Sequence, residues 1–495
     1  MLPDLARAVY GARRRERALR GVMNPAALKP WMPPATTDAP FASTPAAAPS
    51  ALRELMRLAW PVVGLNVLNV LALIVDAIMC GHLENGEEAL MALGFAGQIL
   101  FLMVVIMMGI TVGAVALVAR AHGAGARERV QHLLQQSLQL TVLLGVVAGA
   151  LGVAGSRPLL RMLGADDAVT EAGFGYLAPL MGATVFAYLN ILLGAVLRGV
   201  GNTRLALFVA MVVNALNVLL NAALIFGLGP VPAFGLPGAA YGTIVAQIVG
   251  VLLSVALLRR GVEPALELRL GWAPLDLPLA RELLRVGAPA ALDMMILNAA
   301  LFLIIALLGR ADPLAVAAHG IGMRLQSLAF VPGLSIAQAT GALVGQSLGA
   351  GNVERVRQVV RASSALSAGV LSALGVLIIV LAAPLIALFG AQPGSPLGEL
   401  TWTWMSLLAL GMPLVGAHFA FVGLFQGSGA TNTGLTINAL TVFFFQIPLS
   451  LVLGPLLGLG PLGIWIAFPA SYALKLVLEV VAYRRDGWIK LGIHA

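Results

Sequence analysis

Charged residues are scarce in this sequence: Asp, Glu, Lys and Arg make up 11% of its 495 residues, whereas 59% are hydrophobic. A water-soluble domain needs about a quarter of its residues charged, so the composition excludes an ordinary soluble protein. Long apolar segments recur from residue 58 to residue 483. Each is close to the roughly 20 residues that a helix needs to cross a bilayer, where backbone amides must be paired within the segment. The sequence therefore predicts an all-α polytopic membrane protein.

Cysteine is almost absent, since Cys80 is the single one. One cysteine excludes an intramolecular disulfide and any cysteine-based metal cluster. The HExxH and P-loop motifs are also missing, so we expect no enzyme, no cofactor and no resident metal. The net charge of +8 comes from residues in loops and at the N-terminus rather than on one amphipathic face. This distribution argues against nucleic acid as a partner and for the lipid bilayer.

Twelve segments are apolar enough to be transmembrane helices, and we place them at 58–80, 89–118, 133–155, 172–197, 205–228, 237–258, 283–308, 314–347, 362–390, 400–425, 433–458 and 461–483. Lys and Arg are divided unequally between the connecting segments. The N-terminal tail, the even-numbered loops and the C-terminal tail carry 25 of them, with Arg285 in the first turn of the seventh segment counted in the sixth loop, and the odd-numbered loops carry 3. Because cytoplasmic segments are enriched in Lys and Arg, we expect a multi-pass protein of the cell inner membrane with both termini in the cytoplasm.

The chain repeats itself at a nearly constant offset. A glycine motif begins at Gly123 and again at Gly349, a loop motif begins at Leu197 and again at Phe425, and a proline within a span recurs at Pro61 and Pro289. Each half has six spans, and an even number of spans gives both halves the same orientation. We therefore expect two six-helix lobes related by a pseudo-twofold axis along the membrane normal, with a cavity between them.

The repeat also predicts how the chain is divided. We expect a disordered cytoplasmic tail at 1–50, an N-lobe at 51–258, a cytoplasmic linker at 259–281, a C-lobe at 282–485 and a cytoplasmic tail at 486–495. The first tail is Arg-rich and then rich in Pro, Ala, Ser and Thr, and it lacks the apolar segment of a signal peptide. We expect the protein to be a monomer.

Carboxylates within spans are candidate functional groups, because each costs several kcal/mol unless it is protonated, paired or hydrated. Asp76 lies about 18 residues into the first span, roughly 27 Å from its cytoplasmic end. Asn217 and Asn221 share one face of the fifth span, and Asn221 lies at about the depth of Asp76. We interpret Asp76 as a titratable group open to the external cavity. The alternatives are a solvated helix end for Asp76 and simple interhelical hydrogen bonds for the asparagines.

Three polar residues elsewhere are open to a similar choice. Asn190 in the fourth span is a candidate for the same coupling site, or it hydrogen-bonds a neighbouring helix. Lys475 and Glu479 are four residues apart on the last span, and this spacing predicts a local ion pair near the cytoplasmic end.

The second half contributes two further candidates. Asp293 lies about ten residues into the seventh span, near the middle of the membrane. We interpret it as a group that binds the coupling ion or the cationic substrate, the alternative being a buried partner of Arg324 or His319. His418 in the tenth span either faces the substrate or is hydrogen-bonded within the bundle.

The order and spacing of the motifs resemble those of the multidrug and toxic compound extrusion family, the MATE transporters, over nearly all of the chain after residue 50. The segments that carry the resemblance are Pro61–His82, Leu197–Thr203, Ala317–His319 and Leu343–Gly351. The chain departs from the family at Asn202, where an Asp is usual. It also departs in the second copy of that loop, where Gln426 and Ala430 replace Arg and Asp.

The resemblance implies a secondary active antiporter that exports cationic or amphipathic small molecules, driven by influx of H⁺ or Na⁺ and working by alternating access between the lobes. It also implies that Asp76, Asn217 and Asn221 match the family's cation or proton site in the N-lobe, where Na⁺ bound at Asp76 is an open alternative to H⁺. A lipid-linked precursor flippase of the same superfamily is the alternative function. Such proteins carry around fourteen spans and a more cationic central cavity.

Overall fold

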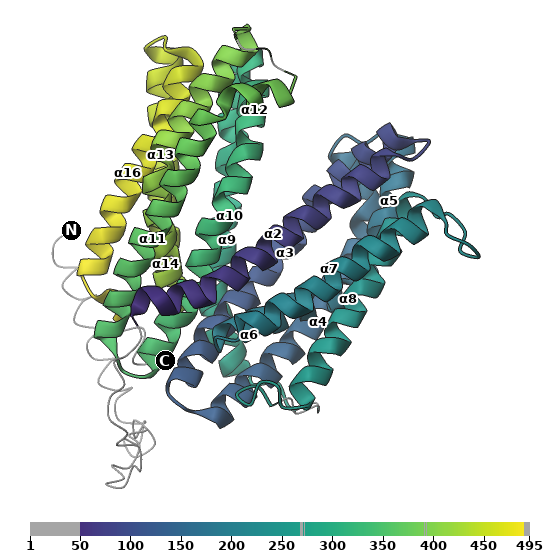
Figure 1. The fold of residues 1–495 in the computed structure, drawn as a ribbon, viewed down its shortest axis with the longest axis vertical. Coiled ribbons are helices and arrows are strands. Elements are labelled where there is room, and N and C mark those ends of the chain that lie inside the picture. The colour runs from purple at the N-terminus through teal and green to yellow at the C-terminus, as the bar shows by residue number, and fades with distance from the viewer. Residues whose placement is uncertain (1–49, 268–270, 272, 391, 393, 490–495) are drawn as a thin grey trace, which may run out of the picture. The chain divides into compact units, whose positions relative to one another are not determined.

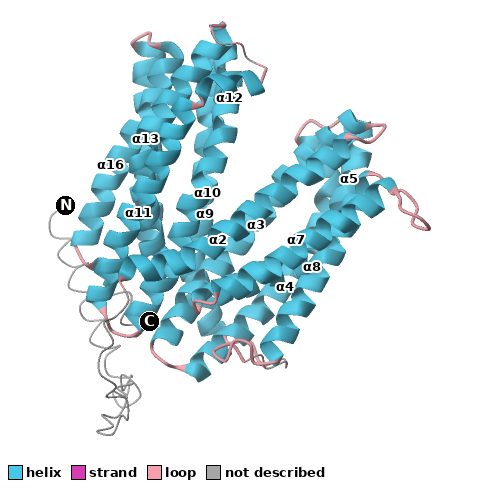
Figure 2. Ribbon diagram, in the orientation of Figure 1, coloured by secondary structure: helices cyan, strands magenta, loops and turns pink. Residues whose placement is uncertain are grey.

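A computed structural model describes residues 50–267, 271, 273–390, 392 and 394–489. These residues are almost entirely helical (Figures 1 and 2). The tail predicted at 1–50 lies outside the described residues apart from Ser50, and so does 490–495 of the C-terminal tail. Ser50 caps the first described helix, because its hydroxyl accepts a hydrogen bond from the amide of Arg53.

The helices fall into two halves of the sequence. The first half consists of α2 (Ala51–Gly81), α3 (Gly86–Gly123), α4 (Arg127–Met162), α5 (Asp167–Gly182), α6 (Thr184–Gly199), α7 (Thr203–Phe226) and α8 (Leu236–Arg259). The second half consists of α9 (Leu277–Ala311), α10 (Pro313–Gly349), α11 (Val353–Val380), α12 (Ala382–Leu388), α13 (Pro396–Ser428), α14 (Thr431–Thr441), η2 (Val442–Gln446), α15 (Ile447–Leu451), η3 (Val452–Leu456) and α16 (Gly460–Arg484).

Among the described residues, 11 helical segments are long and apolar enough to cross a membrane, and there are up to 12 if the bent pair α5–α6 is one span. The predicted all-α membrane fold is therefore confirmed. The segment placed at 172–197 coincides with this pair, and the structure adds that it is broken, because α5 and α6 meet at 57°. The break at Ala183 follows Gly182, a weak helix former, and Pro179, which lacks an amide hydrogen.

The eleventh span is a continuous but irregular helix. It runs over Thr431–Leu456 and contains two π-helical turns, η2 and η3. Pro448 lies just after the first turn and Pro455 within the second. Because proline has no amide hydrogen to donate, a locally widened turn accommodates it without ending the helix.

The two halves form two helix bundles within the unit Ser50–Ala495, the N-lobe from α2–α8 and the C-lobe from α9–α16 (Figure 1). The bundles approach each other where α3 meets α9 and separate toward α5 and α12. At the approach, a Cβ on Gly113 would overlap the carbonyl oxygen of Leu283, and one on Gly287 would overlap that of Gly109. These backbones therefore touch, and glycine is required there. The predicted arrangement of two lobes is confirmed, whereas the exact lobe boundaries stay predictions.

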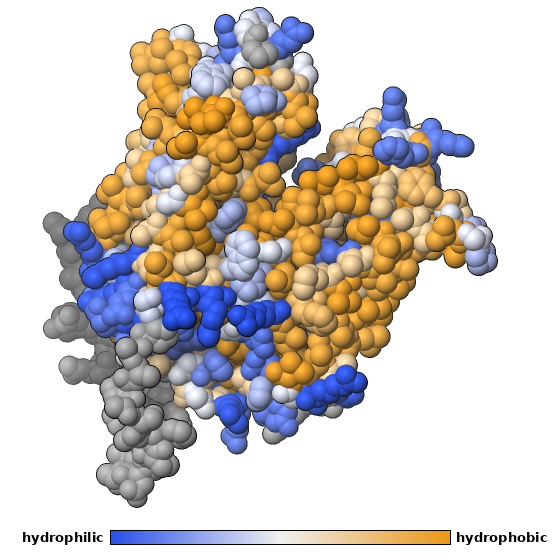
Figure 3. Space-filling view, viewed as in Figure 1, coloured by the Kyte–Doolittle hydropathy of each residue, from blue (hydrophilic) through white to orange (hydrophobic). Residues whose placement is uncertain are grey.

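Apolar side chains cover the outside of both lobes. Figure 3 shows hydrophobic residues over most of the visible face, with hydrophilic residues gathered at the ends of the helices. Large apolar side chains such as Leu73, Val376 and Phe444 are 62–76% exposed. Contiguous apolar surface of this extent needs a nonaqueous environment, as a membrane protein has.

The segment between the lobes is attached to the N-lobe. Three glutamines on α4, Gln135, Gln136 and Gln139, donate hydrogen bonds of 2.8–3.1 Å to the backbone carbonyls of Gly271, Pro274 and Ala273 respectively. The Gln136 side chain also accepts a bond from the amide of Asp276, which caps α9. The connection is therefore held in place along α4 up to the first turn of the C-lobe.

Candidate functional site

A ladder of polar pairs joins α2 to α7. Asn221 Nδ2 donates a hydrogen bond of 2.7 Å to Asp76 Oδ1, and Asn214 Nδ2 donates one of 3.2 Å to Asn69 Oδ1. The two pairs are about two helical turns apart on each of the two helices. The ladder therefore places the predicted carboxylate and one predicted asparagine in direct contact, near the end of α2 on the side where the lobes separate.

The surroundings of Asp76 are almost free of charge. Asp76 is half-buried, and Asn221 is completely buried. Within the described part of the chain, Asp76 forms no salt bridge. The Oδ1 atom of Asn221 has no hydrogen-bond partner there and packs against Gly242, where a Cβ would overlap it. The amide of Asn221 thus presents its N–H group to the carboxylate and turns its oxygen toward α8.

The other two predicted members of this site contact α8 rather than Asp76. Asn217 Nδ2 donates a hydrogen bond of 2.9 Å to Thr243 Oγ1. Asn190 Nδ2 donates to both the backbone oxygen and the side-chain oxygen of Gln247, at 2.6 and 2.7 Å. Thr243 and Gln247 were missed by the sequence analysis. Their spacing of four residues on one helical face was the available signal.

The C-lobe contains a second Asp–Asn pair. Asn438 Nδ2 on α14 donates a hydrogen bond of 2.5 Å to Asp293 Oδ1 on α9. This pair and the pair in the N-lobe have the same separation of 145 residues along the chain. Asn438 was also missed by the sequence analysis, although that common separation was available as a signal.

Near Asp293, His418 and Glu479 form a buried hydrogen-bonded pair between α13 and α16. The distance from His418 Nδ1 to Glu479 Oε1 is 2.7 Å, and both side chains are at most 9% exposed. The ammonium of Lys475 lies 4.5 Å from the centre of the Tyr472 ring. The predicted ion pair between Lys475 and Glu479 is wrong, because the described residues contain no such salt bridge and Glu479 is directed toward α13 instead.

These groups surround one small cavity. Its polar lining includes Asp293, His418, Asn438 and Glu479. Lys475 lies close enough to Asp293 to act on it electrostatically. Glu479 Oε2 and Asn438 Oδ1 are buried there without a hydrogen-bond partner in the described residues. The structure thus brings the two C-lobe candidates of the sequence, Asp293 and His418, into one cluster of ionisable side chains.

The alternative partners considered for Asp293 lie elsewhere. His319 packs against Trp404, with ring centres 4.8 Å apart. The guanidinium of Arg324 lies 5.7 Å from the ring centre of Phe389. Neither forms a hydrogen bond or salt bridge with Asp293 in the described residues, so the interpretation of Asp293 as their partner is wrong.

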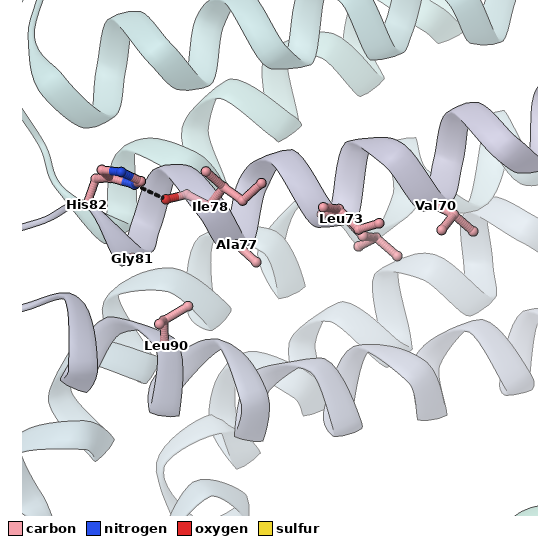
Figure 4. Close-up of a pocket in the computed structure, with 8 residues that line it drawn as sticks. Val70, Leu73, Ala77, Ile78, Gly81, His82 and Leu90 are labelled. Carbon is pink, nitrogen blue, oxygen red and sulfur yellow. Dashed lines mark hydrogen bonds between the residues drawn. The ribbon is translucent and has the colours of Figure 1, made fainter. Parts of the chain in front are cut away.

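A separate hollow of about 570 Å³ opens between the end of α2 and the start of α3. Its lining is largely apolar, and Figure 4 shows most of these side chains on one face of α2 with Leu90 of α3 opposite. His82 Nδ1 is bonded to the carbonyl oxygen of Ile78 at 2.8 Å. Asp76 is not part of the lining, since about 100° of rotation per residue places it on another face of α2.

Each of the two clusters contains a carboxylate, a group that takes up a proton or a cation. Each supplies a carboxylate inside a lobe with an amide donor beside it, and the described residues contain no group of three or more His, Cys, Asp and Glu residues placed to hold a metal ion. A carboxylate held in this way changes the local charge by one unit when it is protonated. That change is the most direct means by which a membrane helix bundle responds to an ion gradient.

Comparison with known proteins gives a consistent result. The family profile described as MatE matches residues 61–223 and 289–452, one match in each lobe. The chain is 28% identical over 446 residues to a probable multidrug resistance protein NorM of Thermotoga maritima, covering 90% of this chain and 95% of that protein. It is 31% identical over 451 residues to a probable NorM of Deinococcus radiodurans, covering 89% and 95%.

A solved structure with the same fold is described as the outward-facing conformation of a multidrug resistance MATE family transporter of the MOP superfamily. It is 22% identical in sequence, with a TM-score of 0.81 over 90% of this chain and 97% of that one. At this level of identity the likeness concerns the fold.

Proposed function

Because the chain belongs to the MatE family of transporters, we propose that it is an antiporter that exports cationic or amphipathic small molecules in exchange for an inward-moving cation. The observation that carries the proposal is the hydrogen bond between Asp76 and Asn221, which joins α2 to α7 inside the N-lobe. Asp76 is the coupling group. Its protonation removes the charge that otherwise opposes burial between the two helices.

The coupling ion in this proposal is H⁺ rather than Na⁺. Na⁺ is bound by oxygen atoms, and a site for it would direct amide oxygens at the ion. Asn221 instead directs its N–H group at Asp76, and Asn217 uses its N–H group on Thr243. An N–H donor stabilises an ionised carboxylate but repels a metal cation. Asn217 and Asn190 support the site indirectly, by holding α7 and α6 against α8.

The C-lobe cluster has the second role, in which Asp293 and His418 act on the cationic substrate or on a second coupling proton. Asp293 is half-buried at the edge of a cavity that also contains the His418–Glu479 pair. Two carboxylates share this cluster with one histidine and one lysine, so when the histidine is neutral one carboxylate charge is left for a cation or a proton to balance.

In the cell, the proposed transporter is a monomer of the inner membrane with both termini in the cytoplasm. The distribution of Lys and Arg between the loops supports this orientation. The lobes then approach each other on the cytoplasmic side and separate on the outer side. Asp76 is nearer the outer side, from which the driving ion enters.

Ethidium efflux from proteoliposomes tests the proposal. The parent protein and Asp76→Asn are compared under an imposed pH gradient and, separately, an imposed Na⁺ gradient. We expect efflux by the parent under the pH gradient and none by Asp76→Asn. The matched control is Glu84→Gln, which removes an exposed carboxylate beyond the end of the same helix and should transport like the parent. If Asp76→Asn exports ethidium as fast as the parent, Asp76 is not the coupling group.

A lipid-linked precursor flippase remains the second candidate. Its anionic substrate requires exposed cationic side chains in the cavity. Lys475, inside the last predicted span, is 2% exposed and does not favour that substrate, whereas Arg324 is exposed beside Phe389 and does not decide against it. Absence of ethidium efflux under both gradients, together with gradient-dependent movement of a fluorescent lipid-linked pyrophosphate in the same vesicles, would favour the flippase.

A further inference from the structure

Two ion pairs cross from one lobe to the other at the end where the lobes approach. Glu54 of α2 pairs with Arg355 of α11 at 2.5 Å, and Glu282 of α9 pairs with Arg129 of α4 at 3.7 Å. The second pair is the internal-repeat copy of the first. Glu54 and Glu282 are separated by the offset of the repeated proline, and Arg129 and Arg355 by the offset of the repeated glycine motif.

Two hydrogen bonds cross the same boundary in the same reciprocal way. The Arg120 guanidinium donates to the carbonyl oxygen of Ser428 at 2.7 Å. The Gln346 amide donates to the carbonyl oxygen of Gly199 at 2.8 Å. Arg120 and Gln346 occupy equivalent positions at the ends of α3 and α10, since each precedes its copy of the glycine motif by the same interval. Each therefore reaches the loop that follows the fourth span of the opposite lobe.

The backbones beneath these bonds are also in reciprocal contact. A Cβ on Gly123 would overlap the carbonyl oxygen of Gln346, and a Cβ on Gly349 would overlap that of Arg120. The two glycines are again equivalent in the repeat. The two backbone segments approach so closely that only glycine fits at these positions, because any side chain would force the lobes apart.

We propose that the four polar contacts form a latch, duplicated by the internal repeat, that holds the lobes together at this end while they are separated at the other. The latch consists of the ion pairs Glu54–Arg355 and Glu282–Arg129 and the hydrogen bonds from Arg120 and Gln346. Every one of them joins two different lobes, so none survives if the lobes part here. The proposal rests on the alternating access of the proposed function, in which this parting happens once in each cycle.

The two ion pairs of the latch differ in strength. The side chains of Arg355 and Glu54 are 18% and 26% exposed, whereas those of Arg129 and Glu282 are 53% and 28% exposed, and the second pair is also longer. Exposure to water and to salt weakens an ion pair. Glu54–Arg355 is therefore the stronger of the two, and its loss should release the latch further.

Distances between two spin labels measure the state of the latch directly. The labels are placed on cysteines at Met162, which ends α4 and is 82% exposed, and Leu388, which ends α12 and is 77% exposed. The background carries Cys80→Ser, which removes the native thiol. Met162 ends the helix that leads into α5, and Leu388 ends α12. Because the lobes separate toward α5 and α12, parting of the latch brings the labels closer together (Figure 1).

The variants are Arg355→Gln, Glu282→Gln and their double combination. We expect Arg355→Gln to lower the ratio of long to short distances by up to about fivefold, the range for a partly exposed ion pair, with Glu282→Gln lowering it less. The reversal Glu54→Arg with Arg355→Glu should restore the parent ratio. Arg357→Gln is the matched control, because Arg357 lies on the same helix but pairs with Asp486 within the C-lobe, at 3.3 Å.

Arg120 provides a second matched pair of variants. Arg120→Gln copies the repeat-related Gln346 and should keep the parent distances, whereas Arg120→Met removes the donor and should shorten them. The proposal is overturned if Arg355→Gln and the double variant both keep the parent distances, or if Arg357→Gln shifts them equally. The distances are recorded without substrate or gradient. If the parent exports no ethidium but the latch variants change the label distances, the proposed function alone is refuted. If the parent exports ethidium but the latch variants keep the parent distances, the latch alone is refuted.

Discussion

The two lobes hold the same kind of polar pair between equivalent helices but at different heights. Asp76–Asn221 joins α2 to α7, and Asp293–Asn438 joins α9 to α14, which are the repeat-related helices. Asp76 lies about four helical turns beyond the proline of its span, whereas Asp293 lies about one turn beyond its own. The difference corresponds to about 16 Å along a helix. The internal repeat has therefore kept the pairing and changed the depth.

The surroundings of the two pairs differ as well. Within the described residues, the polar groups that hydrogen-bond along the helices of the N-lobe pair are neutral amides and a hydroxyl, those of Asn69, Asn214 and Thr243 among them. The pair in the C-lobe shares its cavity with a hydrogen-bonded histidine–glutamate pair and a lysine. The charge of a carboxylate among neutral groups is not balanced by a neighbouring charge. Protonation of Asp76 therefore changes the electrostatic energy of its lobe more than protonation of Asp293 does. This comparison is the reason why we propose ion coupling for Asp76 and a supporting role for Asp293.

Replacing Asp76 by Asn gives the largest expected effect. A group that drives alternating access must change the ratio of the inward-facing to the outward-facing state by a factor on the order of 100 when it is protonated. Asp76→Asn cannot be protonated, so this change in the ratio is lost. We expect ethidium efflux by Asp76→Asn to fall by at least that factor, measured at equal protein density in proteoliposomes. If efflux by Asp293→Asn fell by that factor and efflux by Asp76→Asn did not, ion coupling would belong to the C-lobe and not to the N-lobe.

Replacing His418 tests the stability of the C-lobe. His418→Leu leaves Glu479 with 2% exposure and no partner, and breaking a buried pair in this way costs about 3–5 kcal/mol. The expected result is a lower midpoint in a thermal unfolding series in detergent. Glu479→Gln removes the charge instead and should cost less. Equal midpoints for His418→Leu and the parent would show that the hydrogen-bonded pair does not stabilise the bundle.

Removing the amide beside Asp76 has an intermediate effect. Asn221→Leu deletes a hydrogen bond to a charged group, which contributes about 1.5–3 kcal/mol and so corresponds to roughly tenfold or more. We expect the pH that gives half-maximal ethidium efflux to change in Asn221→Leu. The corresponding variant Asn438→Leu serves as the control in the other lobe and should keep the parent profile. If the pH profile of ethidium efflux changed in Asn438→Leu and not in Asn221→Leu, ion coupling could not be assigned to the N-lobe pair.

Replacing Asp293 should leave coupling to the gradient intact. Asp293→Asn keeps the size of the side chain and its contact with Asn438 but removes one charge near the cavity. Loss of one exposed or half-exposed charge contact with a cationic substrate costs about 1 kcal/mol, or roughly fivefold in apparent affinity. Ethidium titrations under a fixed pH gradient measure this effect. A neutral dye of similar size is the control and should be transported unchanged.

Asn190 gives the smallest expected effect on transport. Its hydrogen bonds go to Gln247 and not to Asp76, so Asn190→Ala should change efflux by no more than about twofold. Efflux assays alongside Asn221→Leu compare the two asparagines directly. A loss as great as that of Asn221→Leu would place Asn190 in the coupling site, as the sequence analysis had considered.

The fold was predictable because hydropathy and internal repetition carry it. Long apolar segments fix the helices, and matching motifs at a common offset fix the two lobes. The bend between α5 and α6 was not predicted, since the apolar segment continues through Ala183 and only tertiary packing decides how a weak point bends.

The candidate site was predictable in its residue types and less so in its partners. The depth of Asn221 on its helix correctly indicated proximity to Asp76. Asn217 and Asn190 hydrogen-bond to α8. The neighbouring helix that a side chain contacts depends on how its own helix is rotated about its axis, and a single sequence does not define that rotation. For Glu479, spacing favoured Lys475 on the same helix, but a buried carboxylate gains more from His418 across the bundle.

Proton release on substrate binding shows whether H⁺ and substrate are linked through Asp76. Purified protein in weakly buffered detergent solution is mixed with ethidium, and a pH indicator counts the protons displaced per bound dye. If substrate and H⁺ compete through Asp76, the parent and Asp293→Asn each release about one proton and Asp76→Asn releases none, because linkage between two ligands is reciprocal. Release of the same number of protons by Asp76→Asn as by the parent would contradict the account.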